Sequence, residues 1–161
     1  MKKPTIREMR WTNKGFIKSN SYNRFEAKAE DSLFLCESDE NFEINCKIKQ
    51  SKSNQGFIIS LTDSTYFSII VKTEIVINSS IKGYKTQCSF PITPYLEKNE
   101  YIKLKVIRNC DIINYYLEFN STFESVAKAF LPGAKVALSF GFILQDNELL
   151  SVQDFYYSKI N

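Results

Sequence analysis

The chain has 161 residues, of which 43% are hydrophobic and 24% charged, and 21 basic residues against 18 acidic residues give a net charge of +3. Basic and acidic residues are interspersed, unlike the clustered positive charge of nucleic-acid-binding proteins, so we expect no nucleic-acid partner. No apolar stretch approaches the roughly 18 residues of a membrane span, and no apolar segment typical of a secretory signal follows the basic N-terminus; we therefore expect a single domain over residues 1–161, no membrane partner and a cytoplasmic location.

The first part of the chain has a mixed pattern, in which Trp11 is predicted to plug the core and residues 25–28 are predicted to form a short strand. Apolar and polar residues then alternate in residues 32–36 and 42–49. An acidic, polar segment lies between these two stretches. We therefore expect them to form a hairpin.

Residues 56–61 and 66–72 are predicted strands joined by the turn 62–65, and residues 74–78 continue the second of them. Residues 84–90 have the composition of a further strand. These segments are rich in β-branched and aromatic residues, which favour a pleated, half-buried surface. The middle of the chain is therefore predicted to consist of strands and polar turns.

The clearest hairpin consists of residues 101–108 and 112–119, two alternating stretches joined by a short polar break. Residues 121–130 fit either a strand or one short helical turn, and residues 135–144 and 151–157 are predicted to close the domain as strands. Many short strands with frequent turn signals predict an all-β sandwich or barrel. The phase that alternates with polar neighbours predicts a core of Phe42, Ile44, Phe57, Ile59, Phe67, Ile69, Leu104, Val106, Tyr115, Leu117, Leu138 and Phe140.

The chain contains four cysteines and no histidine. Without histidine, the catalytic combinations of serine or cysteine with histidine cannot form, which leaves paired carboxylates as the main enzymatic option. The cysteines are widely spaced, with no Cys-x-x-Cys pair, so we expect four free thiols and no zinc site. Asp63, Asp111 and Asp154 are available to calcium, but no loop has Asp-rich spacing. We expect no metal and no cofactor.

Several motifs follow one another in a specific order: Trp11, Phe42-x-Ile-x-Cys, Gly56-Phe-Ile-Ile, Asp63-x-x-Tyr66-Phe67, Ile102-x-Leu-x-Val-x-Arg108 and Gln153-Asp-Phe-Tyr. Over residues 10–158 this order resembles the concanavalin A-like jelly-roll domains of a family of largely uncharacterised bacterial proteins, related to the C-terminal domain of some β-xylosidases. The resemblance implies a β-sandwich of two antiparallel sheets, adjacent N- and C-terminal strands, and carbohydrate as the usual ligand class. The sequence departs from the family at Phe123, where relatives often carry tryptophan.

Three functions are compatible with these observations. The first is a non-catalytic carbohydrate-binding-like domain. The second is a glycoside hydrolase that uses carboxylates on the concave sheet. Its candidate cluster, Glu37, Asp39 and Glu43, spans about 20 Å along a strand and lies in an expected turn, which is unsuitable for a catalytic pair. The third is a structural or self-associating protein, and the sequence leaves the oligomeric state open.

A glycan site needs aromatic rings for the apolar face of the sugar, together with polar groups for its hydroxyls. The phase opposite to the core exposes both kinds of side chain, including Lys105 and Asp154. The predicted ligand-binding residues are Tyr66, Lys103, Asn114, Tyr116, Glu118 and Tyr156. The alternative interpretation is that these tyrosines follow strand propensity alone and cover their neighbours with their rings.

Overall fold

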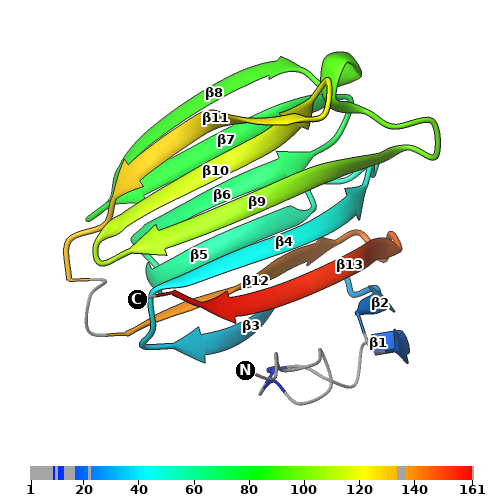
Figure 1. Ribbon diagram of the computed structural model, residues 1–161. Helices are drawn as coiled ribbons and strands as arrows, with labels where there is room; N and C mark the ends of the chain where they lie inside the picture. Colours follow the sequence, from blue (N-terminus) through cyan, green and yellow to red (C-terminus); the bar gives the residue numbers. More distant parts are fainter. Residues whose placement is uncertain (1–8, 10, 13–16, 22, 134–136, 161) are drawn as a thin grey trace.

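In the computed structural model, residues 9, 11–12, 17–21, 23–133 and 137–160 are described. They form two antiparallel sheets packed face to face as a β-sandwich (Figure 1). The seven-stranded sheet has the order β1 (Ile17–Ser21), β2 (Arg24–Ala27), β13 (Leu150–Lys159), β4 (Phe42–Lys49), β9 (Tyr101–Asn109), β10 (Ile112–Phe119) and β11 (Thr122–Phe130). The six-stranded sheet has the order β3 (Asp31–Ser38), β12 (Leu138–Gln145), β5 (Gly56–Thr62), β6 (Thr65–Val71), β7 (Glu74–Ile81) and β8 (Tyr84–Pro91).

The core lies between the sheets and contains every residue that the alternation predicted for it. Trp11 is also buried, and its ring stacks on that of Phe34 with 4.7 Å between the centroids. The prediction that Trp11 plugs the core is therefore confirmed. A strand that buries one face leaves the side chains of the other face outside, so each sheet presents a separate outer face.

The hairpin predicted from residues 32–36 and 42–49 is wrong. β3 pairs with β12 in the six-stranded sheet, whereas β4 pairs with β13 and β9 in the seven-stranded sheet. The chain therefore crosses from one sheet to the other between Ser38 and Phe42. The buried guanidinium of Arg108 stabilises this crossing, because its Nη1 donates to the carbonyl oxygens of Ser38 at 3.2 Å and Glu40 at 2.8 Å.

One further segment differs from the expected pattern, and for a second the structure decides between the two expected alternatives. Residues 66–78 do not continue in one direction, because β6 and β7 are antiparallel partners and the Lys72 N–H donates to the Glu74 carbonyl oxygen at the reversal. Residues 122–130 form β11, which pairs with β10. Ladder hydrogen bonds to β10 favour the strand over the helical turn that the sequence left open.

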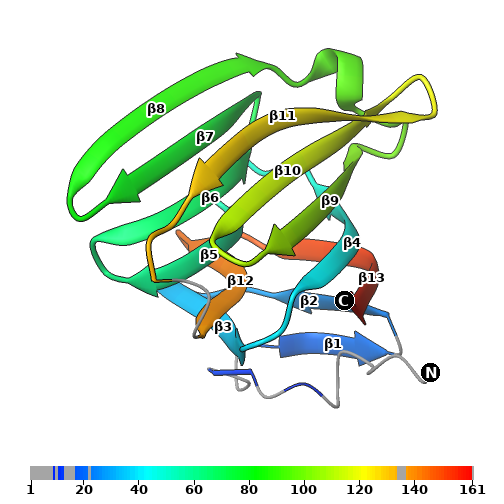
Figure 2. The same ribbon diagram turned by 60° about the vertical axis from the view of Figure 1, so that its left-hand side comes forward.

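A strand from the first part of the described chain and the last described strand lie side by side in the seven-stranded sheet. β2 pairs with β13, as the family resemblance implied (Figure 2). β8 is an edge strand of the six-stranded sheet, and all its residues except Phe90 are exposed. Beyond the strands, the described residues include one short 3-10 helix, η3 (Thr93–Tyr95), and no described helix is long and apolar enough to cross a membrane.

Candidate functional site

A cleft of about 420 Å³ lies on the outer face of the seven-stranded sheet. Its polar lining comes from neighbouring strands and contains amide, ammonium and carboxylate groups, and two aromatic rings complete it. The polar residues are Asn45, Lys47, Lys103, Glu118 and Asp154, and the aromatic residues are Phe123 and Tyr156. The cleft thus combines rings with hydrogen-bonding groups, which is the arrangement that sugar recognition needs.

The strand register explains why these side chains meet. Asn45 is paired with Tyr156 on one side and with Lys105 on the other, and Lys105 is paired in turn with Tyr116. These residues therefore form one row across β13, β4, β9 and β10. Paired residues of antiparallel strands point to the same side of the sheet, so the row lies entirely on the outer face.

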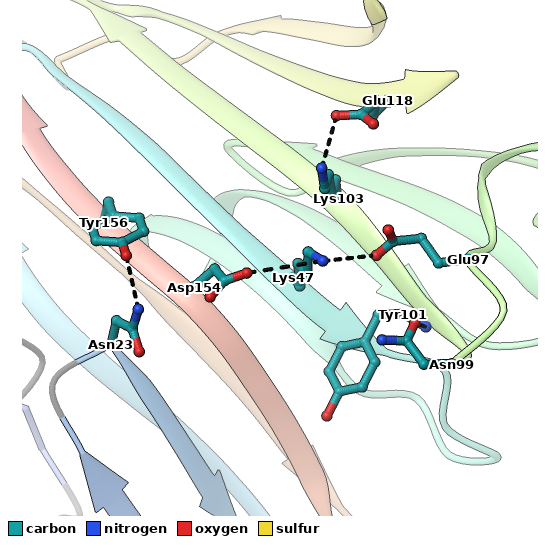
Figure 3. A network of polar contacts seen from close by, with 9 residues as sticks. All are labelled: Asn23, Lys47, Glu97, Asn99, Tyr101, Lys103, Glu118, Asp154 and Tyr156. Atoms are coloured by element: carbon teal, nitrogen blue, oxygen red, sulfur yellow. Dashed lines mark hydrogen bonds and ion pairs between the residues drawn. The ribbon is translucent and has the colours of Figure 1, made fainter. Parts of the chain in front are cut away.

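The charged groups of the cleft, together with Glu97 from the loop before β9, form two sets of ion pairs (Figure 3). Lys103 Nζ lies 3.4 Å from Glu118 Oε2. Lys47 Nζ lies 3.3 Å from Glu97 Oε1 and 3.9 Å from Asp154 Oδ2. All these side chains are partly exposed, and such pairs contribute only about 0 to 1 kcal/mol to stability. Their main effect is to hold the charged atoms in defined positions along the cleft.

A β-bulge brings Asp154 into this group. The register of β13 against β4 shifts between Gln153 and Tyr156, and Asp154 has a positive φ of 51°. A bulge bends its strand and redirects a side chain. Here the bulge accompanies the approach of Asp154 to Lys47. Two residues further along the strand, the hydroxyl oxygen of Tyr156 accepts a hydrogen bond from Asn23 Nδ2 at 2.8 Å (Figure 3).

The aromatic rings at the β11 side of the face hold a lysine. Lys105 Nζ lies 4.5 Å from the centroid of the Phe123 ring and 5.0 Å from that of Tyr116. Such cation–π contacts contribute about 0.5 to 1 kcal/mol at exposed sites. The faces of these two rings are thus shared with the ammonium group of Lys105.

The structure brings together five of the six predicted ligand-binding residues. Lys103, Glu118 and Tyr156 line the cleft. Tyr116 lies on the same face, in the row that contains Asn45 and Lys105. Asn114 is two residues before Tyr116 on β10, so its side chain points to the same face. The Oδ1 atom of Asn114 accepts a hydrogen bond from Ser125 Oγ at 3.2 Å.

The prediction that Tyr66 shares this site is wrong. Tyr66 belongs to β6, in the six-stranded sheet, and lines a different groove of about 510 Å³ on the opposite outer face, together with Asn78 and Gln87. Alternation tells which residues of a strand point outward, but it does not tell which of the two sheets contains the strand.

Sequence reasoning did not select several residues of the cleft. Asn45 and Lys47 alternate with buried residues of β4. The alternation that identified outward-facing residues on other strands would therefore have identified these two as well. Glu97 lies in the loop before β9, and no local pattern links it to the sheet. Its contact with Lys47 depends on the path of the loop.

The carboxylates of the chain have no arrangement typical of a metal site within the described residues, where no group of three potential ligands occurs. The cluster proposed from the sequence does not converge, since Glu37 and Asp39 are exposed and Glu43 accepts a hydrogen bond from Asn45 Nδ2 at 2.9 Å. At the cleft, Glu118 on β10 and Asp154 on β13 are separated by β9 and β4. At a strand spacing of about 4.8 Å this places their backbones roughly 14 Å apart.

Comparison with known proteins identifies the fold. No family model matches the chain, and a search of curated proteins finds no relative. Among solved structures, a functionally unknown protein from Saccharomyces cerevisiae has a TM-score of 0.76 at 10% identity, covering 98% of this chain and 100% of its own. The chain has a concanavalin A-like jelly-roll fold.

Two further structures with this fold carry functional names. The xylan β-1,4-xylosidase from Bacillus halodurans has a TM-score of 0.69 at 11% identity and covers 84% of this chain, which spans only 33% of the xylosidase. The carbohydrate binding module CBM66 from Bacillus subtilis has a TM-score of 0.59 at 14% identity, with 94% of this chain and 92% of the module covered. At such identities the likeness shows the fold alone.

Proposed function

We propose that this protein is a non-catalytic carbohydrate-binding domain whose glycan occupies the cleft on the outer face of the seven-stranded sheet. The observation that carries the proposal is the composition of this cleft, in which Phe123 and Tyr156 flank ion-paired lysines and carboxylates. The strands that carry these two residues are separated by three others, so their backbones are about 19 Å apart across the sheet. That span suits an extended oligosaccharide.

The comparison with CBM66 supports the ligand class. That module shares the fold over nearly its whole length, whereas the chain corresponds to only a third of the xylosidase. A fold by itself does not establish function. The proposal therefore depends on the side chains of the cleft, and the comparison indicates which class of ligand to test first.

The glycosidase alternative is less favoured by the geometry. Retaining glycosidases hold two carboxyl groups about 5 Å apart, and inverting enzymes hold them about 6.5 to 9.5 Å apart. Glu118 and Asp154 lie on strands separated by two others, and each carboxylate contacts a lysine, Lys103 or Lys47, rather than the other carboxylate. Glu97 and Asp154 are closer to each other, but both contact the ammonium group of Lys47, which occupies the position between them.

The four cysteines bear on the cellular compartment of the protein. We propose a reducing, cytoplasmic environment, because Cys36, Cys46, Cys88 and Cys110 are all free thiols and two of them are exposed. Disulfides are rare in the cytosol, whereas exposed thiols of exported proteins are usually paired. The thiol titration described in the Discussion tests this proposal.

The experiment is a glycan-array screen of the wild-type protein, followed by titration of the best ligand into variants. Tyr116→Ala and Tyr156→Ala should each weaken binding by about 1 to 3 kcal/mol without changing the fold, as loss of a ring contact does. Glu118→Gln should weaken it as well, because the amide accepts more weakly than the carboxylate.

Tyr66→Ala is the matched control, since it removes an equivalent ring from the opposite face. It should leave the affinity unchanged. An array without any bound glycan would contradict the proposal, and so would a Tyr66→Ala variant that loses binding while the variants of the cleft retain it. Release of reducing sugar from the bound glycan would favour the glycosidase alternative.

A further inference from the structure

Lys105 lies beside the cleft, against the ring of Phe123, and differs from the two lysines that line the cleft in having no carboxylate partner among the described residues. Lys103 is paired with Glu118, and Lys47 with both Glu97 and Asp154. Within the part of the chain that the structure describes, no carboxylate oxygen lies within 4.0 Å of Lys105 Nζ. The ammonium group rests instead on the rings of Phe123 and Tyr116.

This position has a consequence for any sugar that stacks on those rings. The sugar must share the ring faces with the ammonium group or displace it. Displacement by a neutral sugar loses cation–π contacts worth about a two- to fivefold change in affinity, with no new partner for the charge. A sugar that bears a carboxylate supplies that partner at the same moment, and the lysine stem is flexible enough to follow it.

We propose that the cleft selects glycans that contain a uronic acid, and that Lys105 binds the uronate carboxylate. This inference rests on the proposed function of the cleft. Lys47 and Lys103 already contact carboxylates, so Lys105 is the lysine of this group whose ammonium group is left to contact a carboxylate of the ligand. Two effects then distinguish an acidic sugar from a neutral one. The acidic sugar gains an ion pair with Lys105, whereas the neutral sugar displaces Lys105 from the rings without offering it a new partner.

The test compares two ligands that differ at one group. One is an oligosaccharide containing a uronic acid, and the other is the same oligosaccharide after reduction of the carboxyl group to an alcohol. Calorimetric titration should give an affinity at least about tenfold higher for the acidic form, as expected for a hydrogen bond to a charged group. The difference should narrow as salt is raised from about 0.05 to about 0.5 M, because salt screens exposed charges.

Variants assign the preference to Lys105. In Lys105→Gln the ratio of the two affinities should fall close to one, through weaker binding of the acidic form and unchanged or slightly stronger binding of the neutral form. Lys105→Arg should retain the preference. Lys82→Gln, which removes an exposed lysine from the turn between β7 and β8 in the other sheet, is the matched control and should behave as wild type.

The outcomes separate the two proposals. Equal affinities of the wild type for both ligands, or a preference that persists in Lys105→Gln, would overturn the role of Lys105 and leave carbohydrate binding in place. Absence of binding for both ligands, together with an array that shows no bound glycan, would overturn the proposed function and this inference with it.

Discussion

Tyr115 on β10 joins the two sheets through the backbone of Phe67 on β6. Its hydroxyl donates a hydrogen bond to the Phe67 carbonyl oxygen, and the two rings stack with 4.3 Å between their centroids. Both side chains are buried. A polar group at this depth is stabilising only because it has a partner. The contact therefore fixes how the two sheets align as well as holding them together.

Tyr115→Phe should lower the free energy of unfolding by about 1 to 3 kcal/mol, because the buried carbonyl group loses its partner while the stacked ring remains. Urea denaturation measures the effect. Tyr116→Phe, at the neighbouring outward position, is the control and should change stability by less than about 0.5 kcal/mol. Equal effects of the two changes would contradict the role given to the Tyr115 hydroxyl.

Arg108 should be important for stability although it lies in none of the proposed binding contacts. Arg108→Met keeps an apolar stem but removes the donors that the carbonyl groups of Ser38, Glu40 and Cys110 accept. We expect a loss of about 2 to 4 kcal/mol, since several partly buried acceptors lose a charged donor together. The exposed Lys49→Met on β4 is the comparison. Thermal unfolding with little difference between the two variants would argue against this function of the guanidinium group.

The cysteines should divide into two classes. Cys88 and Cys110 are exposed and should react with a thiol reagent in the folded protein, whereas Cys36 and Cys46 are buried and should react only after unfolding. Burial also raises the pKa of the Cys46 thiol, which slows its reaction further because the thiolate is the nucleophile. Unfolded, non-reduced protein should show four thiols. A lower number would indicate a disulfide and an oxidising compartment.

Alkaline pH should destabilise the fold through Tyr157. Burial raises the pKa of this tyrosine above its ordinary value, while its hydroxyl donates to Glu40 Oε2 at 2.8 Å. The folded state therefore retains the proton more strongly than the unfolded state. The stabilisation is complete below the unfolded pKa of about 10 and is lost progressively as pH rises from there towards the folded value. Tyr157→Phe should show a shallower decline of stability above pH 10 in chemical denaturation. An unchanged slope would contradict this assignment.

Much of the fold could be predicted because strands such as β4, β9 and β10 alternate against one shared core. The alternation of apolar and polar residues predicted that Leu104, Val106 and Phe140 are buried in the core. This prediction did not require knowing which strands pair with theirs. The same pattern could not reveal that the chain changes sheet after Ser38. A hairpin turn and a crossing between sheets are both short polar links. What distinguishes them here is Arg108, about seventy residues away in the sequence, whose donors satisfy the carbonyl groups of the crossing.

The candidate site was predictable to the extent that it lies on regular strands. Lys103 and Glu118 occupy outward positions of one hairpin, so their proximity follows from local register. The bulge that accompanies the approach of Asp154 to Lys47 has no clear sequence signal. The position of Tyr66 on the other face depends on strand order, which alternation within a single strand does not contain.

The open edge of β8 bears on the solubility of the protein. An unpaired ladder of backbone groups is a template on which strands of other molecules can add, and natural proteins interrupt such edges with charge and proline. β8 has one of each near its ends, Lys85 and Pro91, so an incoming strand would find an uninterrupted template only over residues 86–90. Replacing Lys85 or Pro91 would lengthen that template, so mutation at the β8 edge of the six-stranded sheet would favour aggregation.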